Sequence, residues 1–402
     1  MSNWVTLILT LVIQAMVSMA LLTLPVMAPV VAPDMQVSPA LVGLYVSITY
    51  GGAMFASLMG GAAVNRLGAI RVSQWGLVLC AAGLLLCAVP WFPAMGLGAV
   101  LIGLGYGPIT PASSHLLTRT TPKHQMSLVF SLKQTGVPLG SLLAGAVVPS
   151  MLLALSWHQS LATVAAVCLL CASISQPLRS SLDQDRQPDL QIRWGSWMTP
   201  IRLVLAHSTL STLAICSLLL SMVQLSLTTY LVTFLHDGLA YGLVIAGLAL
   251  SATQLGGMVG RIAWGYVADR WLGAQRMLLI LAGLMSLGAL ACATLTVDTP
   301  QAGVIAILVT FGASAIGWNG VYLAEVARRA PEGMASVATG GTLAFTFSGV
   351  VIGPPLFGAL STLFGTYRAG FLGLMTIASL CGIMLYSSQR KIAVIAVSKS
   401  SP

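Results

Sequence analysis

Lys133 is a cation inside an otherwise apolar stretch of the chain, residues 127–150. It follows Ser127 by six residues, which is about 9 Å along a helix that rises about 1.5 Å per residue. An ionisable side chain at such a position is a candidate binding group. Lys133 would attract an anion, and Gln134 beside it could add a hydrogen bond. The alternative is a lysine whose ammonium extends along the helix to lipid headgroups.

Arg261 and Glu325 are two further ionisable residues in apolar stretches. Arg261 precedes Asp269 by eight residues, about 12 Å along a helix, so it lies deeper than a loop anchor. We expect Arg261 to pair with Glu325, and the alternative is contact with a bound anion. Glu325 and Arg328 lie one turn apart on one helix face. We therefore expect Glu325 to belong to a network with Arg328 and Asp269.

The balance of charge in these stretches is basic. No Asp or Glu lies in the middle of residues 4–31, 94–118, 127–150 or 207–235. A site for organic cations would be expected to contain a carboxylate, so the pattern favours a small anion such as a carboxylate. His115, one turn before Arg119, could titrate near neutral pH, although a histidine at a helix end is more often structural.

Uncharged polar side chains complete the set of candidates. Trp318 and Asn319 interrupt an apolar stretch near its middle, between Gly317 and Gly320. A buried Asn needs hydrogen-bond partners, which a cavity supplies as water or as a bound molecule. The Tyr and Trp side chains near span ends could instead be interface anchors. The other cavity candidates are Gln14, Tyr45, Gln224, Tyr230, Gln254 and Tyr322.

The composition indicates where these residues lie. Of the 402 residues, 57% are hydrophobic and 7% are charged, and the mean hydropathy is +0.93. In a water-soluble domain about a quarter of the residues are charged, so we expect this chain to be embedded in a lipid bilayer. The net charge of +9 would favour nucleic-acid binding in a soluble protein. We attribute it to basic residues on the cytoplasmic side and expect no nucleic-acid partner.

Apolar runs of about 20 residues, long enough to cross a bilayer as helices, occur twelve times. Helices bond their backbone amides internally, as lipid requires, so we expect an all-α membrane protein with twelve transmembrane helices. The polar segment 177–206 separates two sets of six. The expected parts are an N-terminal six-helix bundle (1–176), a cytoplasmic linker (177–206) that ends in a short amphipathic helix along the membrane surface, a C-terminal six-helix bundle (207–390) and a cytoplasmic tail (391–402). The predicted spans lie near 4–31, 40–64, 72–90, 94–118, 127–150, 158–176, 207–235, 241–267, 276–297, 301–327, 336–360 and 368–388.

The basic residues predict the orientation of the chain. With a cytoplasmic N-terminus, every Lys and Arg except Arg368 and Lys133 falls on the inner side, as the positive-inside rule requires. The first apolar run is too long for the core of a signal peptide, which spans about 7–15 residues. We expect an uncleaved first helix, both termini in the cytoplasm, and a bacterial inner (plasma) membrane as the location.

One short motif occurs in both halves, after the second and the eighth span. The copies read Gly61-Ala-Ala-Val-Asn65-Arg66-Leu-Gly68 and Gly265-Tyr-Val-Ala-Asp269-Arg270-Trp-Leu-Gly273. The stretch from Arg119 to Ser127 likewise matches that from Arg328 to Ser336. Because the same features recur in the same order, the halves are expected to be parallel repeats.

These features resemble the major facilitator superfamily over essentially the full length of the chain. The signature of that family runs roughly Gly-x-x-x-Asp-Arg-x-Gly-Arg. The first copy has Asn65 in place of the acid, and the second keeps Asp269 but has one extra residue before its last Gly. The resemblance implies two parallel six-helix repeats with a substrate site between them. It also implies that the acid of each half contacts a helix of the opposite half, which would put Asp269 near Ser127 and Asn65 near Ser336.

In this resemblance the repeated turn latches the cytoplasmic side. Asn65 keeps a hydrogen-bonding side chain without the charge, so the latch would be asymmetric; the alternative is that Asn65 caps a turn. The predicted gating residues are Asn65, Arg66, Asp269, Arg270, Arg119, Arg328 and Glu325. The predicted substrate-binding residues are Lys133, Gln134, Gln14, Gln224, Trp318, Asn319 and Tyr322, and Arg261 is an additional intramembrane charge.

The favoured function is a secondary carrier that moves a small organic anion by alternating access, with proton symport in which Glu325 or His115 carries the proton. The alternative is a proton-coupled efflux antiporter for hydrophobic compounds. A Gly-Pro motif at 136–140 and 349–355 resembles that of antiporters in the superfamily, but the missing mid-membrane acid weakens this alternative. A further alternative is a substrate sensor without transport.

An enzyme is not expected, because the chain has no zinc-binding His/Glu pair, nucleophile elbow or phosphate loop. We expect no cofactor and no metal. The expected partners are the small-molecule substrate, protons and the lipid bilayer, and one chain that holds both halves suffices as a monomer.

Overall fold

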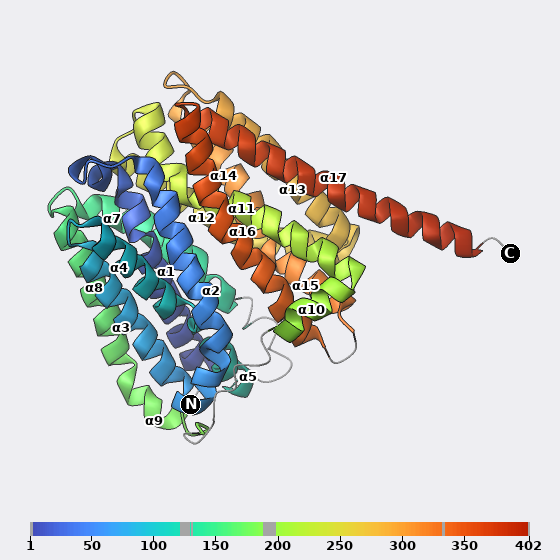
Figure 1. Ribbon diagram of the computed structural model, residues 1–402, viewed down its shortest axis with the longest axis horizontal. Helices are drawn as coiled ribbons and strands as arrows, with labels where there is room; N and C mark the ends of the chain where they lie inside the picture. The colour runs from blue at the N-terminus through green and yellow to red at the C-terminus, as the bar shows by residue number, and fades with distance from the viewer. Residues whose placement is uncertain (1–2, 121–128, 130–131, 188–197, 332–333, 401–402) are drawn as a thin grey trace. The chain divides into compact units, whose positions relative to one another are not determined.

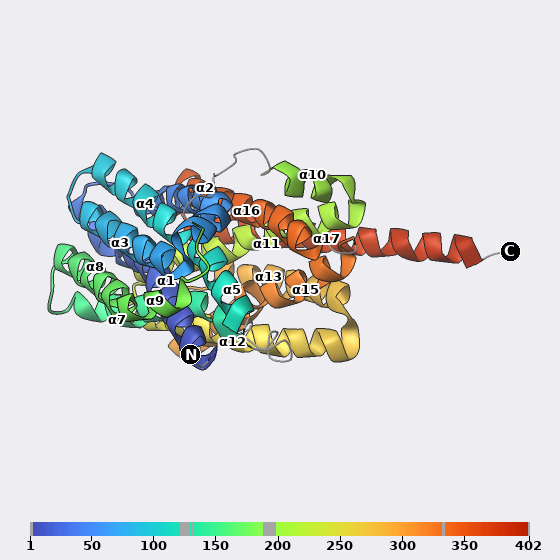
Figure 2. The same ribbon diagram turned by 90° about the horizontal axis from the view of Figure 1, so that it is seen from below.

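The computed structural model describes residues 3–120, 129, 132–187, 198–331 and 334–400. In these ranges the chain forms helices joined by short turns and contains no β-strand (Figures 1 and 2). The prediction of an all-α protein is confirmed. The helices are apolar on most faces, which suits segments whose backbone amides must be bonded internally in lipid.

The helices of the N-terminal half follow the predicted spans closely, except that the span expected at 94–118 is divided at residues 107–108 into the helices Phe92–Tyr106 and Ile109–Thr120. Among the described residues, eleven helical stretches are long and apolar enough to cross a membrane. The fifth predicted span is represented by α7, because the first residues of that span lie outside the described ranges. The helices up to the linker are α1 (Asn3–Asp34), α2 (Val42–Leu67), α3 (Ala69–Cys87), α4 (Phe92–Tyr106), α5 (Ile109–Thr120), α7 (Gly136–Met151), α8 (Trp157–Ile174) and α9 (Arg179–Leu182), with 3-10 turns at Pro39–Leu41 and Gln176–Leu178.

The helices of the C-terminal half differ from the predicted spans at two places. The span expected at 301–327 is divided at Trp318 into two helices, and the last helix continues to Ser400 instead of ending near residue 388. The helices are α10 (Met198–Ala206), α11 (Ser208–Thr233), α12 (Leu243–Val267), α13 (Ala274–Thr294), α14 (Gln301–Gly317), α15 (Asn319–Arg329), α16 (Ala335–Leu363) and α17 (Tyr367–Ser400), with π turns at Phe234–Gly238 and Ala268–Leu272.

The chain forms two compact units. The first consists of Met1–Trp194 and Thr228–Gln254, and the second of Gly195–Leu227 and Leu255–Pro402. The division falls inside α11 and α12, so the end of α11 and the start of α12 belong to the first unit. The boundaries predicted from the sequence, 1–176 and 207–390, refer to the sequence repeats and stay a prediction.

Small residues allow close helix packing in the first unit. A methyl group placed on Gly83 of α3 would lie 2.6 Å from the carbonyl oxygen of Gly98 in α4, and these two helices run side by side (Figure 1). Gly136 and Gly140 of α7 have the same role against α1, where a methyl on Gly140 would lie 2.6 Å from Cβ of Ser18. Helices associate in membranes mainly through this kind of close packing.

The second unit is held by α13, α16 and α17, together with α10 and α11. α17 packs along α13 and α16, and α10 packs along α16. Gly353 of α16 lies against Met222 of α11, where an added methyl would come within 2.6 Å of the Met222 Cα. The thiols of Cys216 in α11 and Cys381 in α17 are buried, with 3.3 Å between their Sγ atoms. The predicted amphipathic segment before α11 is the helix α10.

Candidate substrate-binding and gating residues

Lys133 lies just before a break in the helix that leads into α7. Pro138 has no amide hydrogen, so the carbonyl of Gln134 cannot receive the usual helical bond from it. The backbone turns at Thr135, whose N–H donates to the carbonyl of Leu132 at 3.0 Å and whose Oγ1 donates to the same carbonyl at 2.6 Å. The sequence thus positions Lys133 at the start of a kink.

The neighbours of Lys133 along its helix face α1. A methyl group on Gly136 would lie 2.9 Å from Cβ of Gln14, so this position contacts α1 directly. Val129, one turn before Lys133, packs in a buried cluster with Leu7 of α1. Residues three and four apart share a helix face, so Lys133 occupies the α1-facing side between these two contacts.

The side chain of Lys133 is buried. Its exposed fraction is 1%, and it forms no hydrogen bond or ion pair with any side chain or backbone group in the described part of the chain. Such burial does not fit the alternative in which the ammonium extends to the surface. A buried ammonium without a partner is strongly disfavoured, so this position calls for an anion or for loss of the proton.

Gln14 is a second polar group on the same side of the bundle. Its side chain is fully buried in α1. Its Oε1 accepts a long hydrogen bond, 3.4 Å, from Oγ1 of Thr110 in α5, while Nε2 has no partner among the described residues. A buried donor left without an acceptor costs about 1–3 kcal/mol. Gln14 and Lys133 therefore provide donors that lack acceptors, and the half-buried Gln134 lies next to Lys133.

A polar cluster in the second unit is centred on Gln224 of α11. Its Oε1 accepts hydrogen bonds from Nε1 of Trp318 at 2.9 Å and from Nδ2 of Asn319 at 3.1 Å. Trp318 is fully buried at the break between α14 and α15. The sequence predicted each of these three residues separately, and the structure brings them together.

Tyr322 extends this cluster by one turn of α15. Its ring centroid is 5.3 Å from that of Trp318, with the planes tilted by 59°. Its side chain is 1% exposed, and its hydroxyl, close to Ser217 and Thr342, has no hydrogen-bond partner among the described residues. The cluster combines a buried aromatic pair with an unused hydroxyl, which suits contact with a molecule that has both apolar and polar parts.

Arg261 of α12 bonds to the backbone at the helix break. Its Nε donates to the carbonyl of Ile316 at 3.0 Å, which is one of the carbonyls that the end of α14 leaves without a helical donor. Trp264, one turn later, donates to the carbonyl of Ala313 at 2.7 Å. Arg261 thereby stabilises the interrupted span.

Glu325 bonds to Arg329 and not to Arg261, so the predicted Arg261–Glu325 pair is wrong. Its Oε1 accepts from Nε of Arg329 at 2.9 Å, and its side chain is 5% exposed. Arg328, which was expected to share a network with Glu325, pairs with Asp269 at 2.6 Å. Residues at i and i+4 lie on one face, so the acid and Arg329 form a local pair within α15.

The second copy of the repeated turn contains the Asp269–Arg328 pair in an exposed setting. The side chains of Asp269 and Arg328 are 69% and 52% exposed. Gly273 has φ 77° and ends the turn directly before α13, a conformation that favours glycine. Ser127, the expected partner of Asp269, lies outside the described residues. Arg270 is exposed.

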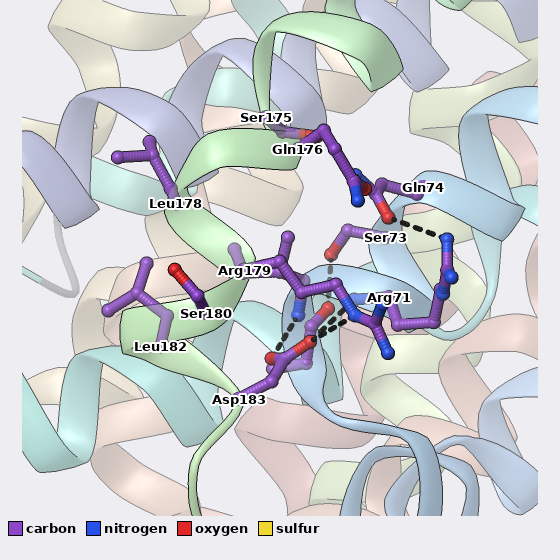
Figure 3. A network of polar contacts seen from close by, with 12 residues as sticks. Arg71, Ser73, Gln74, Ser175, Gln176, Leu178, Arg179, Ser180, Leu182 and Asp183 are labelled. Atoms are coloured by element: carbon purple, nitrogen blue, oxygen red, sulfur yellow. Dashed lines mark hydrogen bonds and ion pairs between the residues drawn. The ribbon is translucent and has the colours of Figure 1, made fainter.

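The first copy of the repeated turn also ends in a glycine with positive φ, but the acid beside it comes from another part of the chain. Gly68 has φ 93°, and the carboxylate of Asp183 lies beside it, after α9. Asp183 accepts from the backbone N–H of Ile70 at 2.8 Å and of Arg71 at 3.0 Å, and Arg179 lies 3.8 Å away. Figure 3 shows these groups converging on the start of α3. A carboxylate at a helix N-terminus is favoured by the free amides and the dipole.

Asn65 and Arg66 of this first copy are exposed. The carbonyl of Asn65 accepts from the backbone N–H of Gln187 at 2.7 Å, so the segment after α9 is attached to the turn. The structure therefore places an acid near a turn whose own acid position holds an amide. Sequence reasoning missed Asp183 because it lies in a polar segment that reads as a solvated linker.

A second acid of this segment, Asp185, binds the C-terminal end of α5. It is bonded to Nε2 of His115 at 2.6 Å and forms an ion pair with Arg119. Arg119 also donates to the carbonyl of Leu182 at 3.3 Å. Partial burial raises the pKa of Asp185. The hydrogen bond from His115 and the charge of Arg119 lower this pKa by a larger amount, so the net pKa is below the ordinary value. His115 is thus part of a cluster with Asp185 and Arg119 at the C-terminal end of α5.

The remaining polar candidates have structural contacts in the first unit. The hydroxyl of Tyr230 donates to the carbonyl of Ala40 at 2.5 Å and accepts from the N–H of Gly43 at 3.1 Å. Gln254 donates to Thr228 at 3.4 Å. The buried hydroxyl of Tyr45 has no partner among the described residues.

The fold and these sites define the class of the protein: a multi-pass helical membrane protein with buried polar groups in its spans. The sequence profile of the Major Facilitator Superfamily matches residues 6–354. The chain therefore belongs to this superfamily and is a membrane transporter, and the twelve-helix repeat layout expected from the sequence fits the fold of the superfamily.

Relatives and solved structures agree with this assignment. The chain is 24% identical over 418 residues to the benzoate transport protein of Acinetobacter baylyi, covering 95% of this chain and 88% of the relative. It is 27% identical over 340 residues to monocarboxylate transporter 11 of Mus musculus, covering 79% and 72%. A solved structure of the nucleoside transporter NupG superposes with a TM-score of 0.81 at 16% identity, covering 95% of this chain and 99% of that chain.

Proposed function

We propose that this transporter is a secondary carrier that moves a small organic anion, a carboxylate, by alternating access together with a proton. In this proposal Lys133 binds the carboxylate. The proposed location is a bacterial inner membrane, with both termini in the cytoplasm and a monomer as the working unit.

The observation that carries the proposal is the buried, unpartnered ammonium of Lys133 on the side of its helix that faces α1, the helix that contains the unused amide donor of Gln14. An ammonium and an amide N–H are both donors, so together they suit a group with two acceptor oxygens. A carboxylate would satisfy both and would neutralise the buried charge. An organic cation would leave both donors without acceptors and would add a like charge.

Two relatives support the same chemical class. They are named as transporters of benzoate and of monocarboxylates, and both kinds of compound have a carboxylate as their charged group. We also assign Gln224, Trp318, Asn319 and Tyr322 to substrate contact, since this cluster offers an aromatic pair and a free hydroxyl. Asp269 with Arg328, Arg270, Asn65, Arg66, Arg119 and Glu325 remain proposed gating residues.

The test is ligand-induced thermal stabilisation of the purified protein. The panel contains benzoate, lactate, succinate and the lipophilic cation tetraphenylphosphonium. A ligand that binds only the folded state raises the unfolding midpoint by mass action. We expect one of the carboxylates to stabilise the wild type, and we expect Lys133→Gln to weaken its binding at least tenfold, about 1.4 kcal/mol.

Arg368→Gln is the matched control, because it removes one positive charge from an exposed position. It is expected to bind the same carboxylate as tightly as the wild type. Stabilisation by tetraphenylphosphonium alone, or unchanged carboxylate affinity in Lys133→Gln, would contradict the proposal and favour an efflux antiporter.

A further inference from the structure

The carboxylates described in the first unit all bond to groups other than Lys133. Its described acidic residues are Asp34, Asp183, Asp185 and Asp237. Asp34 accepts from Nε1 of Trp157 at 2.7 Å. Asp183 bonds to the start of α3 and Asp185 to the C-terminal end of α5, and Asp237 is bonded to the neighbouring His236. No acid in the described part of this unit is thus available as a fixed counter-ion for Lys133.

The elements that pack against Lys133 contain few titratable groups. α1 has no charged residue before Asp34, its last residue, and α7 has none. α5 contributes His115 and Arg119, which are paired with Asp185. The part of α12 that belongs to this unit, residues 243–254, has no charged residue. Apart from these paired groups, the described parts of α1, α5, α7 and α12 in this unit offer Lys133 only neutral amide, hydroxyl and hydrocarbon groups.

Resting on the function proposed above, we infer that Nζ of Lys133 carries the coupled proton. A buried ammonium with no counter-ion is too costly to persist, so the empty, closed carrier holds Lys133 as a neutral amine. When a carboxylate enters, the amine takes one proton from the water on the same side and becomes the ammonium that pairs with the anion.

The charges balance over one cycle. The loaded carrier contains one ammonium and one carboxylate, so the bound pair is neutral when the carrier changes its facing side. After the carboxylate leaves, the ammonium releases its proton to water on the receiving side and the neutral amine returns. One proton and one carboxylate cross together, without net charge. Glu325 and His115, which sequence reasoning considered as proton carriers, have their own partners, Arg329 and Asp185.

The experiment measures protons taken up when the anion binds. Wild-type protein in detergent is titrated with benzoate in a calorimeter, in two buffers of the same pH but different protonation enthalpy. The difference between the two heats gives the number of protons bound per anion, by linkage. We expect uptake of about one proton per benzoate in the wild type, because linkage requires the amine to gain a proton as the anion binds.

Lys133→Arg separates the charge from the proton, because an arginine stays protonated. This variant is expected to bind benzoate with proton uptake near zero. Glu325→Gln and His115→Asn test the two alternative proton carriers, and each is expected to take up the same number of protons per bound benzoate as the wild type, whatever its effect on the rate of transport. In liposomes, a pH gradient should drive benzoate accumulation by the wild type, whereas Lys133→Arg should perform anion exchange without accumulation.

The outcomes separate this inference from the proposed function. Benzoate binding without proton uptake in the wild type would overturn the inference and leave the anion carrier intact, and this arm needs no variant to fold. Unchanged uptake in Lys133→Arg, or uptake lost in Glu325→Gln, would overturn it in favour of another proton carrier. Failure of every carboxylate in the panel to bind would contradict the proposed function itself.

Discussion

At the scale of single residues, buried polar groups are placed so that some remain without partners. Lys133, Gln14 Nε2 and the hydroxyl of Tyr322 are each buried, and none has a hydrogen-bond partner in the described ranges. A folded protein rarely leaves such groups unbonded, because each costs free energy. Where they do occur, a ligand, water or proton exchange is the natural explanation, and this is why these residues dominate the proposed function.

Trp318 has a measurable structural role in the second unit. Trp318→Phe removes the indole donor and leaves Gln224 Oε1 with Asn319 as its remaining donor in this cluster. We expect a loss of about 1 kcal/mol in the free energy of unfolding, measured by thermal unfolding in detergent. The control is Trp271→Phe at a side chain that is 69% exposed, where little change is expected. Equal melting of both variants would contradict the role of this hydrogen bond.

Asp185 should make stability depend on pH in the acid range. Its pKa is lower in the folded protein than in the unfolded chain because of His115 and Arg119, despite partial burial. The contribution is therefore complete above the unfolded pKa, about 4, and is lost as the pH falls through the folded pKa. The melting temperature of the wild type should exceed that of Asp185→Asn at pH 7, and the gap should narrow below pH 4. A gap of constant size from pH 7 to pH 3 would disprove this linkage.

At the scale of elements, the segment after α8 is bonded to the ends of three helices: the C-terminal ends of α2 and α5 and the start of α3. Asp183 caps α3, Asp185 binds α5, and the backbone of Gln187 bonds to the turn after α2. Gln74 of α3 also donates to Gln176 at 2.8 Å (Figure 3). The segment that reads as a linker in the sequence is thus, up to residue 187, part of the N-terminal bundle.

Replacing the cap tests this attachment. Asp183→Ala would leave one buried and one partly buried backbone N–H group at the start of α3 without acceptors, so we expect a loss of about 1–2 kcal/mol in unfolding free energy. Proteolysis between residues 176 and 187 should also become faster. Ser180→Ala, at an exposed position in the same short helix α9, is the control and should behave like the wild type. Loss of stability in both variants would argue against a specific cap.

At the scale of the whole molecule, the compact units do not coincide with the sequence halves. The end of α11 and the start of α12 belong to the first unit. Two contacts there show why: Tyr230 bonds to the turn before α2, and Gly247 of α12 lies against Gly145 of α7. Ser251 adds a hydrogen bond to the carbonyl of Leu142 at 2.8 Å.

Gly247→Ala is expected to disturb the close contact between α7 and α12. The added methyl would come within 2.5 Å of Cγ of Pro149 and also meet the backbone of Gly145. Such overpacking costs about 1–3 kcal/mol, so we expect a lower melting temperature and slower carboxylate uptake in liposomes. Gly242→Ala, where a methyl meets nothing within 4 Å, is the control. A variant at Gly247 that melts and transports like the control would show that the contact is dispensable.

The sequence by itself determined the helical membrane fold, the repeat and the position of the buried lysine. These follow from features that act locally: long apolar runs, a repeated turn that ends in Gly68 or Gly273, and a helix break at Trp318, which lies between Gly317 and Gly320. Each can be read from spacing because backbone amides in lipid have to be bonded within a helix.

Only the tertiary structure decided which side chains meet. Three contacts depend on how the helices rotate and pack. Asp183 caps α3, Arg261 bonds to Ile316, and Glu325 bonds to Arg329 instead of joining a network with Asp269. Contacts between residues far apart in sequence leave no periodic signal, and several polar partners compete for each charged group at similar spacing. The physical reason is that packing, rather than local pattern, fixes the direction and the neighbours of a side chain.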